Sequence, residues 1–341
     1  MFAKKFNPVN FHQIYEFIRG LPVTNQDFIE KAKIRQSNLT KPRGSLGRLE
    51  ELAVFVSGWQ ATDTPLVEKV EAIIFAGNHG ICDQGVNPFP QEVTRQMVEN
   101  FKNNGAAINQ ICNSNGINLK VVDLELDRPT QDFSDSPAMT ESETLDAFKV
   151  GWNAVNKDTQ VLILGEMGIG NSTVASAICS AIFGGSVDSW VGPGTGSDSA
   201  GIQKKIKLIE NSLVRHKDEL SSPLEILSIF GGREQAAICG AILSARANSN
   251  VVILDGFICC ASASILHAMG EQALEHCLLG HLSAEPASRS LASLLGKKPI
   301  LDLDMRLGEG SGAALSFSIL KAAINCHNGM ASFAEAGVDT S

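Results

Sequence analysis

The chain has 341 residues, of which 44% are hydrophobic and 19% charged, and its formal net charge is −9 at pH 7. This composition is that of a globular protein rather than a disordered one, and the length leaves room for one large domain and a smaller one. The acidic balance argues against a nucleic-acid surface, which would need a clustered basic face.

Amphipathic segments open the chain. Apolar residues recur at every third or fourth position in residues 11–21, 27–39 and 46–60, which predicts three helices. At the other end, "GMASFAEAGV" (329–338) predicts a short helix after a break at "NCHNG". If this last helix packs on the first three, both ends of the chain build one small helical domain.

Short apolar runs alternate with helix-like segments between these ends. They are rich in Val, Ile and Leu, and several end in glycine. The runs are "VEAIIFAG", "NLKVVDLEL", "TQVLILGEMG", "LEILSIFGG", "NVVILDGF" and "KPILDLDM". Such runs are typical of strands buried on both faces of a parallel sheet with flanking helices. We therefore predict an α/β fold, with a large domain at 62–325 and a small domain from 1–61 and 326–341.

The segment "FAGNHGICDQGVNPFPQEVT" follows the first of these runs. His79 could act as a base, although a single histidine in a turn is more often a structural hydrogen-bond partner. The "NPFP" segment (87–90) predicts a stiff loop with an aromatic face that could stack on a flat ring. The roles of Asn78 and His79 stay open at this point.

The third run continues into "LGEMGIGNST", where Glu166 lies among three glycines. Asn171, Ser172 or Thr173 can cap the helix that follows. Glycines after a strand and before a helix mark the edge of an α/β sheet where ligands bind.

The turn "VGPGTGSDSAG" (191–201) precedes a helix-like segment that carries Lys204 and Lys205. Its backbone N–H groups could cradle a phosphate beside one of these lysines. The alternative is a flexible loop before an exposed helix with solvated lysines. The turn matches no P-loop pattern, so alone it does not decide between the two.

Two further turns contribute single polar side chains. Asp255 follows an apolar run, and one carboxylate can hold a ribose hydroxyl but recruits Mg²⁺ poorly. Ser283 in "GHLSAEP" lacks the G-x-S-x-G pattern of a nucleophile, which leaves a phosphate contact or a helix cap.

The stretch "RLGEGSGAAL" (306–315) places one carboxylate, Glu309, between two glycines at a strand-to-helix turn. A capping turn with a solvated acid is one explanation. Because Glu166 repeats the arrangement at another strand end, a binding cleft is the better one.

No pattern in the sequence indicates a metal or a cofactor. The eight cysteines form no CxxC pair, and the seven histidines show no HExxH-type spacing. The N-terminus lacks an apolar core of signal-peptide length, and the most apolar stretch is broken by Asp255. We expect reduced thiols, no membrane span, no metal, no cofactor and a cytoplasmic location.

Taken together, the motifs resemble those of a known family. In order, they are "KPRGSLGRLEELA", "AGNHGI…GVNPFPQEVT", "LGEMGIGNST", "VGPGTG", "GGREQAAICGAI", "LDGFI", "GHLSAEP" and "DMRLGEGSGAAL". They closely resemble the nicotinate-nucleotide–dimethylbenzimidazole phosphoribosyltransferases of cobalamin lower-ligand synthesis, from about residue 41 to 337. The resemblance implies a Rossmann-like large domain, a small helical domain built from both termini, and a homodimer.

The implied reaction transfers phosphoribose from nicotinate mononucleotide to 5,6-dimethylbenzimidazole, giving α-ribazole 5′-phosphate and nicotinate. By resemblance, Glu309 is the general base and Glu166 lies beside the reacting centre. The flanking glycines would then clear room for a ring whose proton Glu309 takes. The other implied site residues contact phosphate (Gly194, Lys205, Ser283), lie near the ribose (Gly168, Asp255) or border the benzimidazole (Gln91, Leu307). Lys205 is the only full positive charge that the sequence suggests near the phosphate.

The alternative function is a nucleotide-binding dehydrogenase or a regulatory module on the same fold. It would need a G-x-G-x-x-G fingerprint with an acid about twenty residues further on. The chain lacks a clean match, which favours the transferase.

Overall fold

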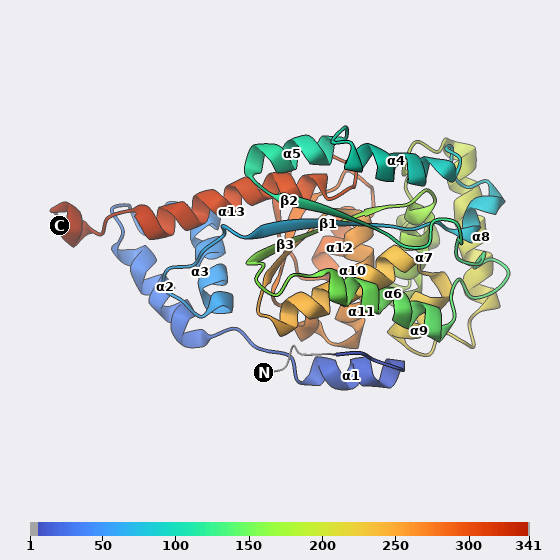
Figure 1. Ribbon diagram of the computed structural model, residues 1–341, viewed down its shortest axis with the longest axis horizontal. Coiled ribbons are helices and arrows are strands. Elements are labelled where there is room, and N and C mark those ends of the chain that lie inside the picture. Colours follow the sequence, from blue (N-terminus) through green and yellow to red (C-terminus); the bar gives the residue numbers. More distant parts are fainter. Residues whose placement is uncertain (1–5, 340–341) are drawn as a thin grey trace.

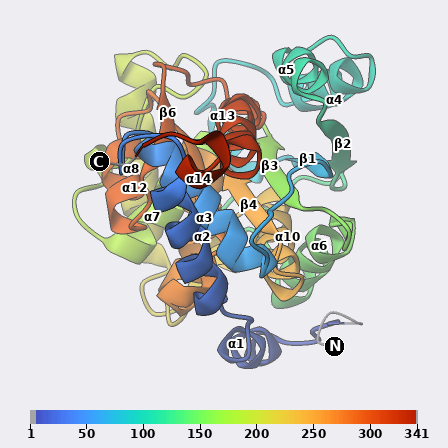
Figure 2. The ribbon, with the colours of Figure 1, turned by 90° about the vertical axis from the view of Figure 1, so that its left-hand side faces the viewer.

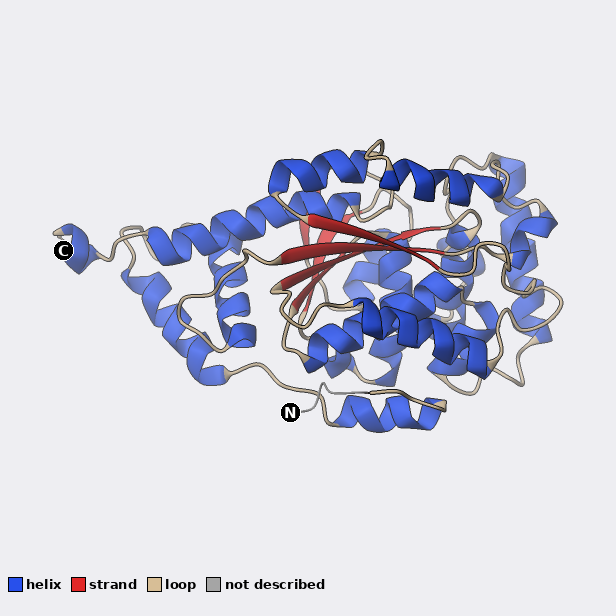
Figure 3. Ribbon diagram, in the orientation of Figure 1, coloured by secondary structure: helices blue, strands red, loops and turns tan. Residues whose placement is uncertain are grey.

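The computed structural model describes residues 6–339, and a parallel sheet of six strands forms the centre of these residues (Figure 3). The strands lie in the order β2-β1-β3-β4-β5-β6, and each neighbouring pair is parallel. Their bounds are β1 Val70–Ala76, β2 Asn118–Asp123, β3 Val161–Met167, β4 Val251–Leu254, β5 Cys277–Leu282 and β6 Pro299–Asp302. The predicted α/β fold with a parallel sheet is confirmed.

Each central strand is apolar on both sides because each face of the sheet has its own core. In β1, Ile73 and Phe75 pack into one hydrophobic cluster, while Ala72 and Ile74 pack into the other. This alternation follows from the two-residue period of a strand. Continuous Val, Ile and Leu runs are therefore required here, as the sequence pattern indicated.

Helices cover both faces of the sheet (Figure 1). Helices α3, α5 and α13 share a core with one face, and α6, α7, α10 and α11 share a core with the other. The α-helices are α1 Phe11–Arg19, α2 Gln26–Asn38, α3 Arg48–Gln60, α4 Glu92–Lys102, α5 Ala107–Asn115, α6 Glu141–Ala154, α7 Asn171–Phe183, α8 Ser199–Arg215, α9 Pro223–Phe230, α10 Arg233–Ala247, α11 Phe257–Met269, α12 Ser288–Leu294, α13 Ser311–Gly329 and α14 Phe333–Ala336. Short 3₁₀ helices are η1 Gly80–Gln84, η2 Val187–Ser189 and η3 Glu271–Leu274.

The prediction of a strand at "LEILSIFGG" is wrong, because this segment forms α9. The side chain of Ser222 accepts a hydrogen bond from the N–H of Glu225, and Pro223 occupies the first helical position. Both features favour a helix start. Periodicity could not reveal it, since a helix buried on most sides reads as a continuous apolar run. The strand that completes the sheet is β5, to which the sequence analysis assigned no strand.

Helix α2 and the C-terminal part of the chain meet beside the sheet, at the end of the molecule that faces the viewer in Figure 2. The guanidinium of Arg35 in α2 donates to the carbonyls of His327, Asn328 and Met330. Leu39 pairs with Ser332 through an isolated antiparallel bridge. These contacts join α2 to the last turn of α13 and to the segment that follows it.

The expected domain boundaries do not coincide with breaks in the structure. Helix α13 runs unbroken through 325/326 and through "NCHNG". At the N-terminus, Ile14 and Ile18 of α1 pack into the same cluster as Phe148 and Trp152 of α6. Helix α1 therefore packs on the larger α/β part, and the division into two domains stays a prediction. Across residues 6–339, we find no helix with the length and apolarity needed to span a bilayer.

Candidate active site

A cleft lies at the carboxyl edge of the sheet, over the ends of β3, β4, β5 and β6. Open α/β sheets bind their ligands at this edge. Seven of the residues predicted from the sequence line the cleft: Glu166, Gly168, Gly194, Asp255, Ser283, Leu307 and Glu309. It is also lined by Met167, Ile169, Asn171, Ser172, Thr195, Gly256, Phe257, Ile258, His281, Glu285, Arg306 and Gly308.

Helix N-termini bring backbone N–H groups to the cleft although the protein is acidic. The first residues of α7, Asn171 and Ser172, line it, and so do Phe257 and Ile258 at the start of α11. Helix α13 begins directly after Glu309 and Gly310. Unpaired N–H groups at a helix start favour anions without adding net charge.

The turn that carries Glu309 is left-handed over three residues, with φ of +84° at Gly308, +62° at Glu309 and +78° at Gly310. A positive φ at a residue other than glycine costs of order 1–3 kcal/mol, so the surroundings must hold Glu309 in place. The turn also packs closely on β3, because a Cβ on Gly165 would lie 2.6 Å from the nitrogen of Gly310.

Asp255 fixes this turn from the end of β4. Its carboxylate accepts hydrogen bonds from the N–H groups of Gly310 at 3.2 Å and Ala313 at 2.9 Å. His281 Nε2 lies 3.4 Å from the same carboxylate. Asp255 therefore caps α13, a structural role that its position in the sequence did not indicate.

The carboxyl groups of Glu309 and Glu166 are both withdrawn from water. Burial, and then the charge of Asp255, raises the pKa of Glu309 to about 7. Burial, and then the charges of Asp255, Glu234 and Glu309, raises the pKa of Glu166 to about 8. Asn171 donates a short hydrogen bond to Glu166, which opposes part of this shift. Each of the two carboxyl groups can therefore gain or lose a proton near neutral pH.

Glu309 keeps one oxygen, Oε2, buried and without a hydrogen-bond partner among the described residues. Such an atom is available to a ligand. Gly308 has a role that was not expected. A Cβ on Gly308 would lie 2.7 Å from Glu166 Oε1, so this glycine makes room for the second carboxyl group.

Gly194 is the centre of a polar corner on the other side of the cleft. Its φ of +56° suits glycine, and a Cβ there would lie 2.6 Å from Ser172 Oγ and 3.5 Å from Lys205 Nζ. Lys205 is buried, which lowers the pKa of its ammonium group, while Glu285 nearby acts in the opposite direction. Ser283 accepts a hydrogen bond from the N–H of Glu285 at 3.3 Å.

Arg306 supplies a second cation that the sequence analysis missed. Its Nη1 donates to the carbonyl of Gly194 at 3.0 Å and so bridges the two glycine turns. The signal was present, since Arg306 directly precedes the predicted Leu307. Exposed Leu307 lies at the mouth of the cleft beside Arg306.

Gln91 does not line the cleft. Its Nε2 donates to the carbonyl of His79 at 2.7 Å, so it holds the loop after β1. Lys204 is exposed, in contrast to the buried Lys205 one position further along α8. No group of three or more His, Cys, Asp or Glu side chains that could hold a metal ion occurs within residues 6–339.

A parallel α/β sheet with helix starts, two cations and three carboxyl groups of raised pKa at its carboxyl edge indicates an enzyme for an anionic small-molecule substrate. The comparisons with known proteins specify the class. A phosphoribosyltransferase family model matches residues 21–338. The chain belongs to the nicotinate-nucleotide–dimethylbenzimidazole phosphoribosyltransferase family.

Relatives and solved structures agree over nearly the whole chain. The Rhodobacter capsulatus enzyme of this name is 52% identical over 329 residues, which cover 96% of this chain and 98% of the relative. The Brucella anthropi enzyme is 47% identical over 331 residues, covering 97% and 98%. The crystal structure of CobT from Thermus thermophilus matches with a TM-score of 0.86 at 36% identity, covering 92% of this chain and all of that one. None of these relatives supports the dehydrogenase alternative.

Proposed function

We propose that this cleft transfers phosphoribose from nicotinate mononucleotide to 5,6-dimethylbenzimidazole, with Glu309 as the general base. The products are α-ribazole 5′-phosphate and nicotinate, and the former supplies the lower ligand of cobalamin. The observation that carries the proposal is the pair of buried carboxyl groups, Glu309 and Glu166, opposite a polar corner around Gly194.

The phosphate of the donor fits the corner around Gly194. Lys205 and Arg306 supply charge, while the backbone of the glycine turn and the Ser283 hydroxyl supply hydrogen bonds. Glu285, half-buried beside both cations, offsets part of their positive charge. A phosphate held here would place the ribose between the corner and Glu166, near Gly168.

The acceptor base fits between Glu309 and Leu307 at the mouth of the cleft. One imidazole nitrogen attacks the anomeric carbon of the ribose, and the bond from that carbon to the pyridine nitrogen breaks. The bonding electrons return to the pyridine ring, which loses its positive charge and leaves as nicotinate. The free oxygen of Glu309 accepts the proton of the other imidazole nitrogen, and its pKa near 7 suits this task.

Positioning contributes more to this reaction than the base does. Holding the two reactants in line can lower the barrier by roughly 7–11 kcal/mol. Glu166 borders the ribose, where positive charge develops as the old bond breaks. The positively charged ring nitrogen of the donor favours the ionised forms of both carboxyl groups, so donor binding prepares Glu309 to accept a proton.

A spectrophotometric assay tests the proposal. Ultraviolet absorbance should report release of nicotinate that depends on added 5,6-dimethylbenzimidazole, without any NAD(P)H signal. Nicotinate release at the same rate without the benzimidazole would indicate a hydrolase instead. The homodimer and the cytoplasmic location implied by the family are parts of this proposal, and sedimentation equilibrium tests the former.

A further inference from the structure

His79 and Glu234 form a buried pair beneath the floor of the cleft. Their side chains are fully buried, and His79 Nε2 lies 2.9 Å from Glu234 Oε1. His79 comes from the loop after β1, and Glu234 belongs to the first turn of α10. The sequence alone left the role of His79 open.

Glycines from separate segments make room for this pair. A Cβ on Gly77 would lie 2.3 Å from Glu234 Oε2, and a Cβ on Gly232 would lie 2.3 Å from His79 Cε1. A Cβ on Gly168, which lines the cleft, would lie 2.9 Å from His79 Nε2. The pair therefore supports the cleft from directly behind Gly168, between the ends of β1 and β3, where the order of the strands reverses.

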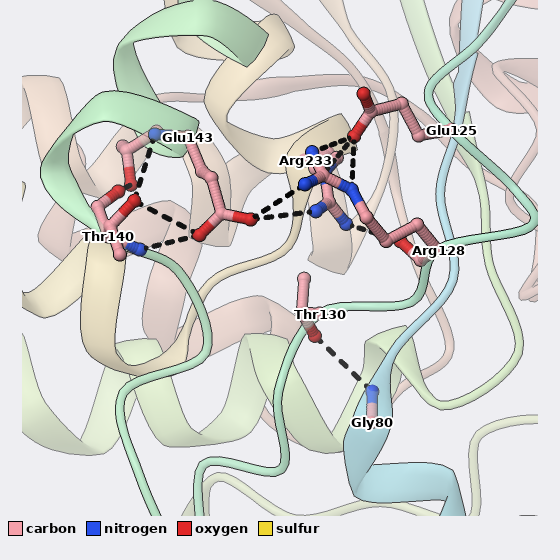
Figure 4. Close-up of polar contacts among 8 residues, drawn as sticks. Gly80, Glu125, Arg128, Thr130, Thr140, Glu143 and Arg233 are labelled. Carbon is pink, nitrogen blue, oxygen red and sulfur yellow. Dashed lines mark hydrogen bonds and ion pairs between the residues drawn. The ribbon is translucent and has the colours of Figure 1, made fainter.

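The backbone around His79 is tied to neighbouring segments on both sides. Gln91 at the start of α4 donates to the His79 carbonyl, as described above. On the other side, Thr130 N–H donates to the carbonyl of Asn78 at 3.1 Å, and Gly80 N–H donates to Thr130 Oγ1 at 3.3 Å (Figure 4). A displacement of His79 would thus move several loops at this edge of the sheet.

A second network holds Arg233, the residue before Glu234 in α10 (Figure 4). The guanidinium of Arg233 lies 3.2 Å from carboxylate oxygens of both Glu125 and Glu143, and it donates to the carbonyl of Arg128 at 2.7 Å. Glu143 in turn completes a capping box with Thr140 at the start of α6. The first turn of α10 is therefore anchored independently of the cleft.

The electrostatic surroundings of the pair extend to Glu166. Glu234 is fully buried, and among residues 6–339 its ion-pair partner is His79, whose Nε2 lies 2.9 Å from Glu234 Oε1. The charged groups that act on Glu166 are Asp255, Glu234 and Glu309, which oppose its ionisation, while the Asn171 amide favours it.

We propose that the His79–Glu234 pair is a positioning element of the transferase site: it fixes the loops of β1 and β3 behind Gly168 and holds the charge of Glu234 beneath Glu166. This inference rests on the proposed function. Neither residue touches substrate, and both act through Gly168 and Glu166.

The test compares Glu234→Gln, His79→Gln and the double variant with the wild-type enzyme. The amide keeps the shape of Glu234 and removes only its charge. His216→Gln is the matched control, because His216 is also a buried histidine, 3.0 Å from the carboxylate of Glu219, but lies outside the cleft. Melting temperature, kcat and KM for each substrate, and the pH dependence of kcat/KM are measured for each variant.

Each single variant should lower kcat/KM by up to roughly 10²-fold, as expected from a misplaced reacting group. Glu234→Gln should move the higher apparent pKa of the pH profile downward, because a negative charge near Glu166 is lost. His79→Gln should move it upward, because Glu234 is left uncompensated. The double variant should recover melting temperature but keep the downward shift. His216→Gln should lower the melting temperature alone.

The inference is overturned if Glu234→Gln folds and its pH profile coincides with that of the wild type. Shifts of both single variants in the same direction, or a shift of equal size in His216→Gln, would overturn it as well. If His79→Gln does not fold, Glu234→Gln and the double variant still decide the matter. The wild-type assay tests the proposed function separately, since that proposal fails if wild-type enzyme releases no nicotinate.

Discussion

Asp255 holds the backbone of Gly310, whose N–H donates to its carboxylate at 3.2 Å, and so fixes the turn that presents Glu309. A second bond from Ala313 N–H makes Asp255 the cap of α13. The same carboxylate raises the proton affinity of Glu309 and Glu166. One buried acid therefore controls both the geometry and the protonation of the proposed catalytic pair.

Replacing Asp255 by Asn should affect both properties. The amide has one acceptor oxygen for two N–H groups, so the free energy of unfolding should fall by about 1–3 kcal/mol. Loss of the negative charge should also move the acid limb of the kcat/KM profile to lower pH. Urea unfolding and a pH–rate profile measure these effects. Exposed Asp302→Asn is the control, and equal effects of both substitutions would contradict the assigned role.

The raised pKa of Glu166 predicts how stability depends on pH. Between the ordinary glutamate value of 4.5 and about 8, the folded protein retains a proton that the unfolded chain has released. Stability from this group is therefore fully present below 4.5 and is lost as pH rises towards 8. Glu166→Gln should lose less unfolding free energy than the wild type between about pH 5 and about pH 8. Parallel losses in both proteins would refute the assignment, and exposed Glu30→Gln serves as the control.

Lys205→Met should weaken binding of nicotinate mononucleotide on the order of tenfold to a hundredfold, since a charge-assisted contact contributes about 1.5–3 kcal/mol. Methionine preserves most of the buried volume. Binding of free 5,6-dimethylbenzimidazole, which has no phosphate, should hardly change. Titration calorimetry measures both affinities. Exposed Lys204→Met is the matched control, and a loss confined to that variant would place the phosphate elsewhere.

Arg306→Gln should weaken the same donor by about tenfold, because Arg306 both carries charge and ties its turn to the carbonyl of Gly194. The effect should appear in KM for nicotinate mononucleotide more than in kcat. Exposed Arg289, paired with Asp302 outside the cleft, provides the control substitution Arg289→Gln. If KM rises equally in both variants, Arg306 contributes only to the general surface charge.

Much of the site could be predicted because a parallel sheet brings its strand ends to one edge. Glycine-flanked acids such as Glu166 and Glu309 follow apolar runs, so their shared location follows from the fold class alone. Ser283 was assigned from its own motif and from the resemblance, because the strand before it was not recognised. At α9, burial on most sides removed the periodicity that distinguishes a helix from a strand.

Contacts between distant segments could not be predicted in this way. The pairing of His79 with Glu234 joins residues 155 positions apart, and no spacing pattern in the sequence predicts it. The hydrogen bond from Ala313 N–H in the first turn of α13 to Asp255 likewise depends on how the two segments are placed in space. Gln91 was assigned to the cleft by resemblance, whereas its side chain donates a hydrogen bond to the carbonyl of His79.

The pH dependence of kcat for Glu309→Gln against the wild type is the most direct test of the account. With both substrates saturating, wild-type kcat should rise with pH as Glu309 ionises, at or below the pKa of about 7 that this group has without substrate. Glu309→Gln should fold normally, lose about 10²–10⁴-fold in kcat and show no such rise. A Glu309→Gln enzyme with near-wild-type kcat across this range would contradict the role of Glu309 as the general base.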